Sequence, residues 1–176
     1  SYQNRIRCIK NLKELGYQVG IGFMVGSPYQ SDEMLAKEMV FLKKLNPAMV
    51  GIGPYISHKD TPFSNMNSGS AELTTFLLSL IRLTLPGVLL PATTALATID
   101  NKGREKGILA GANVLMPNLS PLGVRKKYLL YDNKICLGDE AASCIRCLDK
   151  KISKIDRKIV TDRGDYALLN REIERD

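Results

Sequence analysis

The chain has 176 residues, of which 44% are hydrophobic and 24% are charged, and its formal net charge is +7. This balance is typical of one globular domain of modest size and excludes disordered, collagenous and coiled-coil proteins. The apolar stretches are too interrupted for a transmembrane helix. The densest basic stretch, 146–158, lacks the aromatic residues of a nucleic-acid interface. This composition favours a solvated helix over one that binds an anionic partner.

The N-terminal part alternates helices with a short apolar strand. Residues 3–15 predict an amphipathic helix, and Gly16 follows where a left-handed residue commonly ends a helix. The apolar run at 18–26 predicts a strand that is buried on both faces. Ser31 is in position to cap a second helix, which ends before Pro47.

The same alternation continues to residue 117. We expect a strand at 49–55, a helix at 71–85, a third strand at 88–95, a short helix at 103–110 and a fourth strand at 112–117. Strands that alternate with helices at this spacing predict a parallel sheet with outer helices. The predicted fold class is therefore α/β, with four parallel strands that make half of an eight-stranded (β/α)8 TIM-type barrel.

This half-barrel is expected over residues 1–130, and residues 131–176 are expected to form a C-terminal extension with cysteines and a charged tail. A half-barrel leaves two strand edges unpaired, and apolar faces around Val25, Ile52, Leu89 and Val114 need cover. We therefore expect either the missing half of the barrel or a second copy of the chain, in a homodimer, to cover them. The chain begins without Met and without a signal-peptide pattern, so we expect it to be cytoplasmic and cut at its N-terminus.

The cysteines carry the most informative local spacing. Cys136, Cys144 and Cys147 form a C-x7-C-x2-C group. Thiolates at this spacing can bind a soft metal or an iron-sulfur cluster, although a fourth ligand is missing and three unligated thiols near a turn are the alternative. Residues 136–147 are expected to form a loop or short turn before a polar helix at 145–159. Cys8 is interpreted as a small buried residue.

Other candidate residues are weaker. The glycines at 20–26 lie inside a strand and are not a dinucleotide fingerprint, but they can let a ligand or a helix approach the sheet. Thr93 and Thr94 end the third strand, where their hydroxyls can hold a carboxylate or simply finish the strand as β-branched residues. His58 has no partner at a catalytic spacing and is interpreted as a loop residue.

A set of motifs in order identifies a family. They are Asn4-Arg5, Gly-x-Met-Val-Gly-x-Pro at 22–28, Met-Val-Gly-Ile-Gly-Pro-Tyr at 49–55, His-x-Asp-Thr-Pro at 58–62, Pro-Ala-Thr-Thr-Ala at 91–95, Gly-Ala-Asn-Val-x-Met-Pro-Asn at 111–118 and Lys-Ile-Cys at 134–136. From residue 2 to about residue 150, the chain resembles the C-terminal half of the radical S-adenosylmethionine maturase of iron-only (FeFe) hydrogenase, which contains the biotin and thiamin synthesis associated region.

The resemblance implies roles for individual residues. Arg5 matches the arginine that pairs with the carboxylate of S-adenosylmethionine, and Met24 and Met49 match residues of the adenosyl pocket. Thr93 and Thr94 match the substrate-site pair. The residues that match the cavity below this pair are Met116, Tyr128 and Tyr131, for which amphipathic packing is the alternative. The ligands of a second, peripheral and optional iron-sulfur cluster are matched by Cys136, Cys144 and Cys147.

The family cleaves S-adenosylmethionine reductively to a radical and acts on a small thiol or thioether-type substrate while the hydrogenase di-iron site is assembled with other maturation proteins. Its catalytic cluster needs a C-x3-C-x2-C motif, which this sequence lacks, so the resemblance implies that the chain alone is inactive. The alternatives are a non-catalytic module that binds an iron-sulfur cluster or a partner, and part of another enzyme similar to biotin synthase.

Overall fold

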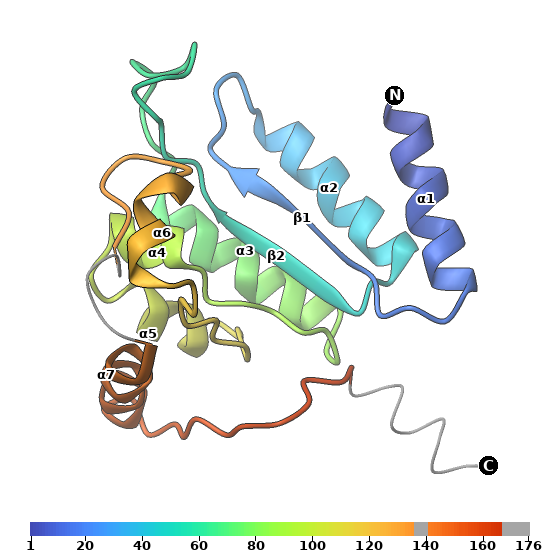
Figure 1. Ribbon diagram of the computed structural model, residues 1–176. Coiled ribbons are helices and arrows are strands. Elements are labelled where there is room, and N and C mark those ends of the chain that lie inside the picture. Colours follow the sequence, from blue (N-terminus) through green and yellow to red (C-terminus); the bar gives the residue numbers. More distant parts are fainter. Residues whose placement is uncertain (136–140, 167–176) are drawn as a thin grey trace, which may run out of the picture.

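The computed structural model of the chain describes residues 1–135 and 141–166 (Figure 1). Two parallel strands alternate with helices in an α/β arrangement. The first elements are α1 (Tyr2–Glu14), β1 (Gly20–Val25), α2 (Asp32–Leu45), β2 (Met49–Pro54) and α3 (Ala71–Thr84). The later elements are α4 (Thr94–Ile99), α5 (Gly103–Leu109), α6 (Leu122–Arg125), the 3-10 helix η1 (Lys126–Tyr128) and α7 (Ala141–Ser153). Among these described helices, none has the length and apolar character needed to cross a membrane.

The ends of the first helices follow from local chemistry. Ser31 caps α2, because its hydroxyl oxygen accepts a hydrogen bond from the amide of Met34 at 3.3 Å. Gly16 has a φ of +83° after α1, and Asn46 has a φ of +47° after α2, so both occupy the left-handed region that commonly ends a helix. The expected start of α2 and the expected ends of both helices are therefore confirmed.

The strands β1 and β2 pair in parallel, with Gly20 opposite Met49 and Val25 opposite Pro54. Alternate residues of each strand point to opposite sides of a sheet. One face carries the buried side chains of Val25, Val50 and Ile52. The opposite face carries Gly20, Gly22 and Met24 from β1 and Met49, Gly51 and Gly53 from β2, and we call these six residues the open face.

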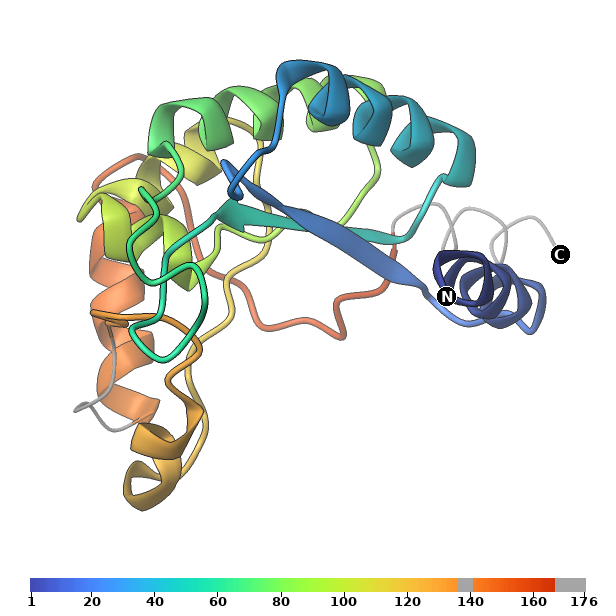
Figure 2. The same cartoon turned by 90° about the horizontal axis from the view of Figure 1, so that it is seen from above.

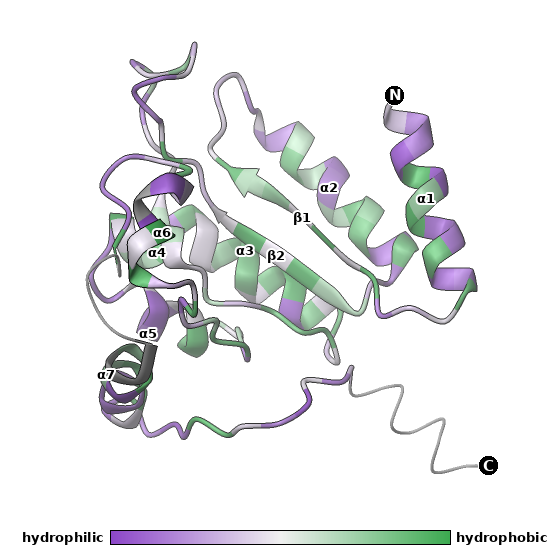
Figure 3. Ribbon diagram, in the orientation of Figure 1, coloured by the Kyte–Doolittle hydropathy of each residue, from purple (hydrophilic) through white to green (hydrophobic). Residues whose placement is uncertain are grey.

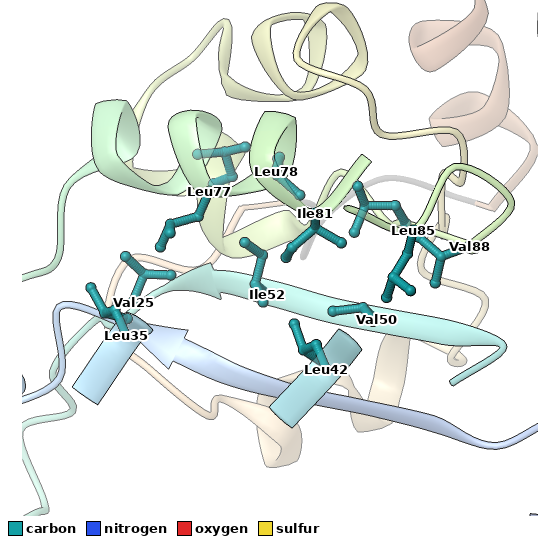
Figure 4. Close-up of a cluster of buried hydrophobic side chains, with 12 residues drawn as sticks. Val25, Leu35, Leu42, Val50, Ile52, Leu77, Leu78, Ile81, Leu85 and Val88 are labelled. Carbon is teal, nitrogen blue, oxygen red and sulfur yellow. The ribbon is translucent and has the colours of Figure 1, made fainter. Parts of the chain in front are cut away.

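Helices α2 and α3 cover the first of these faces (Figure 2). The core between strands and helices contains Val25, Leu35, Leu42, Val50, Ile52, Leu77, Leu78, Ile81, Leu85, Val88, Leu90 and Leu96 (Figure 4). Val25 and Ile52 are 0% and 1% exposed. The expectation that an external partner must cover their side chains is therefore wrong, because the chain's own helices do so.

Only two of the four expected strands form in the described part of the chain. The third and fourth segments each make isolated parallel bridges, from Leu89 to Met49 and from Pro91 to Val114. Backbone hydrogen bonds support both contacts, since the amide of Val50 donates to the carbonyl of Leu89 at 2.9 Å and the amide of Ala92 donates to that of Val114 at 3.0 Å. The segments lie in the expected parallel order without reaching full strand length.

The expected third strand is also too long at its C-terminal end. Thr93 caps α4, and its hydroxyl oxygen accepts from the amide of Leu96 at 3.3 Å, so the residues after it are helical. Helix α7 begins at residue 141, earlier than the helix expected at 145–159, and therefore includes Cys144 and Cys147. Helices α6 and η1 were not expected. Cys8 is exposed on α1 rather than buried.

The C-terminal part of the chain returns to the first half. The amide of Asp132 donates to the carbonyl of Ser57 at 3.0 Å. After α7, an extended segment reaches Gln18, whose side-chain amide donates to Asp165 at 3.0 Å and accepts from the amide of Tyr166 at 2.8 Å. The domain boundary expected at residues 130 and 131 stays a prediction.

Candidate site on the open face

The open face consists of four glycines and two methionines, and some of the candidate residues lie on it or beside it. Helices α2 and α3 cover the opposite face (Figure 2), whereas α4 reaches only the Gly53 end of the open face, where a Cβ would lie 3.6 Å from that of Ala95. Side chains do not fit at Gly22, where a Cβ would lie 1.8 Å from the carbonyl oxygen of Gly51. A Cβ at Gly51 would meet no atom within 4 Å. The open face therefore offers space in which a ligand can approach the backbone closely.

Gly53 brings the candidate residues Met24 and Thr93 together. Met24 is paired with Gly53 in the register of the sheet. A Cβ at Gly53 would lie only 2.8 Å from the hydroxyl oxygen of Thr93, so this hydroxyl lies over the carboxyl end of β2. Met24 is 57% exposed at the same end of β1. The carboxyl ends of parallel strands are where α/β barrels place their active sites.

Both threonine hydroxyls at this end of the sheet act as acceptors within the protein. Thr93 Oγ1 accepts from the amide of Leu96 at 3.3 Å, and Thr94 Oγ1 accepts from Nη2 of Arg104 at 3.1 Å. Neither hydroxyl donates a hydrogen bond to any acceptor in residues 1–135 and 141–166. With respect to the described residues, each hydroxyl proton is thus available for an acceptor, and two adjacent donors suit a carboxylate.

The segment that carries Tyr131 is tied to the same helix. Thr98 Oγ1 donates to the carbonyl of Thr94 at 3.0 Å, and the amide of Ile135 lies 3.5 Å from Thr98 Oγ1. Nζ of Lys134 lies 5.9 Å from the centre of the Tyr131 ring, in cation–π range. The hydrogen bond of Ile135 holds the end of this segment close to α4, although Ile135 and Thr98 are far apart in the sequence.

The structure does not bring every candidate residue to this place. Met49 is at the amino end of β2, opposite Gly20 and four residues before Gly53, which corresponds to about 13 Å along a strand. Arg5 is exposed in the first half of α1, whose N-terminus lies on the side of the carboxyl end of β1 (Figure 1). Met116 and Tyr128 are 53% and 61% exposed.

The cysteine group is only partly described. Cys144 is buried and Cys147 is exposed, and both lie on α7, three residues apart. That spacing places them on neighbouring turns of one helix. Cys136 lies outside the described residues. Within residues 1–135 and 141–166, no group of three or more metal-ligating side chains is brought together, so the cluster stays a prediction from the sequence.

Arg104 is a residue of this site that the sequence analysis missed. It is only 6% exposed, although a short helix rich in Lys, Arg and Glu is expected to be solvated. Its burial follows from Gly103 and Gly107, which let α5 pack tightly against α4. At Gly103, a Cβ would lie 2.3 Å from the carbonyl oxygen of Leu96. The pair of glycines around the arginine was the available signal.

Comparison with known proteins shows what the chain is similar to. No protein-family model matches the chain. The chain is 45% identical over 164 residues to the FeFe hydrogenase maturase subunit HydE of Thermotoga maritima, an alignment that covers 93% of the chain and 47% of that protein. The chain thus spans about half the length of the curated relative that it matches. The resemblance to the maturase of iron-only hydrogenase is confirmed, and the chain is a HydE-like protein.

Proposed function

We propose that the chain supplies the C-terminal half of a TIM-type barrel in a radical S-adenosylmethionine enzyme of hydrogenase maturation, and with it part of the cofactor and substrate cavity. The observation that carries the proposal is that the hydroxyls of Thr93 and Thr94, at the carboxyl end of β2, donate to no acceptor among the described residues. The similarity to HydE supports the assignment to a maturase.

The open face fits one side of a cavity for S-adenosylmethionine. Gly51 leaves space that a side chain would fill, and Met24 presents an exposed thioether edge beside it. Arg5 would hold the carboxylate of the cofactor through its planar guanidinium. When bound, this cofactor supplies radical chemistry. We assign Met24 to the adenosyl pocket on its position, whereas the place of Met49 at the far end of the sheet favours filling the base of the cavity.

The substrate site that we propose lies beside this pocket. Thr93 and Thr94 donate to a carboxylate of the substrate, because their lone pairs already accept from Leu96 and Arg104. We place Tyr131, together with the exposed Met116 and Tyr128, along the path by which the substrate enters the site. A small thiol or thioether compound that carries a carboxylate matches this combination of two hydroxyl donors with sulfur and aromatic neighbours.

We also propose a peripheral iron-sulfur cluster on Cys144 and Cys147, with Cys136 as the third protein ligand. The position of the first two on neighbouring turns of α7 supports a shared metal. This cluster is separate from the radical chemistry, and the C-x3-C-x2-C motif that such chemistry needs is not in the sequence. The chain by itself is therefore proposed to be inactive.

A second polypeptide segment would complete the cavity. Within the described residues, β1 has no strand partner on the edge away from β2. Helix α1 beside that edge buries none of its side chains, although hydrophobic residues recur along it (Figure 3). Leu12 and Leu15 are 42% and 73% exposed. We propose that the N-terminal half of the barrel covers these surfaces, with a second copy of the chain as the alternative and other maturation proteins as further partners.

Cofactor binding tests the proposal. The protein is prepared as a complex of the chain with the part of T. maritima HydE that it does not cover, called the completed protein below. We expect Arg5→Ala to weaken S-adenosylmethionine binding by about 1.5 to 3 kcal/mol, the usual contribution of a hydrogen bond to a charged group. Arg7→Ala, also exposed on α1, is the matched control. Equal affinities for Arg5→Ala and the control in calorimetry would remove Arg5 from the site.

A further inference from the structure

Arg104 is placed where a charged side chain is costly. Burial of an unpaired charge is strongly unfavourable, so a buried arginine is held by hydrogen bonds. Its Nη2 donates to the Thr94 hydroxyl at 3.1 Å, across the interface between α5 and α4. Gly103 and Gly107 on α5 allow this approach, because a Cβ at either position would press on Leu96.

Two other arginines, the half-buried Arg82 and the buried Arg125, show a different use. Arg82 donates from Nε to the carbonyl of Gly111 at 2.8 Å and from Nη1 to that of Pro86 at 2.6 Å. Arg125 donates to the carbonyls of Ser120 and Asn118. Those contacts fasten loops to the fold. Arg104, by contrast, donates to a side-chain hydroxyl of the candidate site, so its hydrogen bond acts on a group that a ligand can contact.

This hydrogen bond determines what the Thr94 hydroxyl can do. A hydroxyl has one proton and two lone pairs, and rotation about χ1 and the C–O bond decides where the proton points. The backbone at Thr94 is held by Thr98, whose hydroxyl donates to the Thr94 carbonyl at 3.0 Å. Only the side chain then remains to be oriented, and donation from Arg104 to one lone pair directs the proton away from α5.

We propose that Arg104 is a positioning residue, which orients Thr94 Oγ1 as a hydrogen-bond donor to the carboxylate of the substrate. The inference rests on the proposed function, which places a small carboxylate at Thr93 and Thr94. Arg104 acts through Thr94 and does not contact the substrate. The charged donor also polarises the hydroxyl, which strengthens the hydrogen bond that Thr94 gives in turn.

A double-mutant cycle in the completed protein tests the coupling. The variants are Arg104→Met, which keeps a long side chain without donors, the near-isosteric Thr94→Val, and their combination. Calorimetry measures the affinity for S-methyl-L-cysteine, a thioether with a carboxylate. We expect each single change to weaken binding about fivefold to tenfold, and Arg104→Met to have no further effect once Thr94 is Val. Independent losses in the double variant would overturn the proposal.

Two controls separate positioning from general stability. Arg82→Met removes another half-buried arginine and should lower the melting temperature without changing the affinity. Arg104→Lys keeps a cation and a donor and should recover part of the affinity, and it replaces Arg104→Met if that variant does not fold. A lower melting temperature with unchanged affinity in both Arg104 variants would show a purely structural role and overturn the proposal.

Nuclear magnetic resonance of the full chain tests the orientation without a ligand. With threonine methyl groups labelled with ¹³C, the couplings of the Thr94 methyl report its χ1 rotamer. We expect one rotamer in the wild type, averaging in Arg104→Met, and less averaging in Arg104→Lys, which keeps a donor. An unchanged single rotamer would contradict the positioning role. If the wild type failed to bind S-methyl-L-cysteine, the proposed substrate site would fail, while the rotamer result would still decide the role of Arg104.

Discussion

Gly53 and Thr93 are so close that a Cβ at residue 53 would lie 2.8 Å from the hydroxyl oxygen of Thr93. Such a separation is too short for a carbon and an oxygen that are not bonded. The hydroxyl can therefore lie over β2 only because residue 53 has no side chain. This contact links the open face to the threonine pair and makes the geometry of the candidate site depend on a glycine.

Gly53→Ala is expected to displace Thr93 and weaken binding of S-methyl-L-cysteine in the completed protein. Gly51→Ala is the matched control for stability, since it lies on the same face of the same strand and its Cβ would meet nothing within 4 Å of the chain. Melting temperatures of the full chain should fall more for Gly53→Ala than for Gly51→Ala. Equal melting temperatures and an unchanged affinity for Gly53→Ala would contradict the close contact.

The core predicts a second pair of variants. Leu78 is fully buried on α3, whereas Leu83 on the same helix is 77% exposed. Leu78→Ala should lower the free energy of unfolding by about 2 to 5 kcal/mol, because it removes buried methyl groups and leaves a cavity. Leu83→Ala should change it by less than about 0.5 kcal/mol. Denaturant titration of both variants measures the difference. Similar losses in the free energy of unfolding would contradict the packing of α3 against the sheet.

The pH dependence of stability is expected to include Asp100. Its pKa is lowered, first by the hydrogen bond from Lys106 Nζ at 2.5 Å and then by the amide of Lys102 at 2.9 Å. The folded pKa is below the unfolded one, so the carboxylate stabilises the fold above the unfolded pKa, and this contribution is lost as pH falls through the folded pKa. Asp100→Asn should therefore lower the melting temperature at neutral pH, with a difference that shrinks in acid.

Lys106→Met provides the check on this explanation. It removes the main cause of the lowered pKa and should produce a loss of stability with the same dependence on pH. Melting temperatures are measured across a series of buffers of different pH. If Asp100→Asn lowered the melting temperature as much in acid as at neutral pH, the result would contradict the ion pair.

Iron binding is expected to depend on the α7 cysteines. After anaerobic reconstitution with iron and sulfide, the wild-type chain should show visible charge-transfer absorption, and the double variant Cys144→Ser, Cys147→Ser should lose it. Cys8→Ser is the control, because this thiol is exposed on α1 and is not part of the spacing. Equal iron content in the double variant and the control would end the cluster proposal.

Elements with strong local signals could be predicted from the sequence. Ser31 predicts the start of α2, and Gly16 predicts the end of α1, because capping depends on local chemistry. Residues 88–95 show the limit of this reasoning. Thr93 has a high strand propensity, but as an N-cap it satisfies the amide of Leu96, and the capped helix replaces the end of the strand.

Which side of a strand is covered could not be read from its composition. The apolar runs of β1 and β2 predict burial on both faces, yet in the described part of the chain α2 and α3 cover the face with Val25 and Ile52, while α4 reaches only the Gly53 end of the other. Glycines raise the apolar character of a run without providing side chains to bury. Arg104 was missed for a related reason, since its burial depends on close packing between α5 and α4 that no single position in the sequence reveals.

Assembly and cofactor binding test the central proposal together. We would co-express the chain with the part of T. maritima HydE that it does not cover, measure the mass by light scattering, and titrate the product with S-adenosylmethionine. We predict a one-to-one complex that binds the cofactor, whereas the chain alone binds it weakly or not at all. A chain that remains a monodisperse monomer, unfolds cooperatively by itself and neither associates nor gains cofactor affinity would contradict the proposal that it supplies half of a shared cavity.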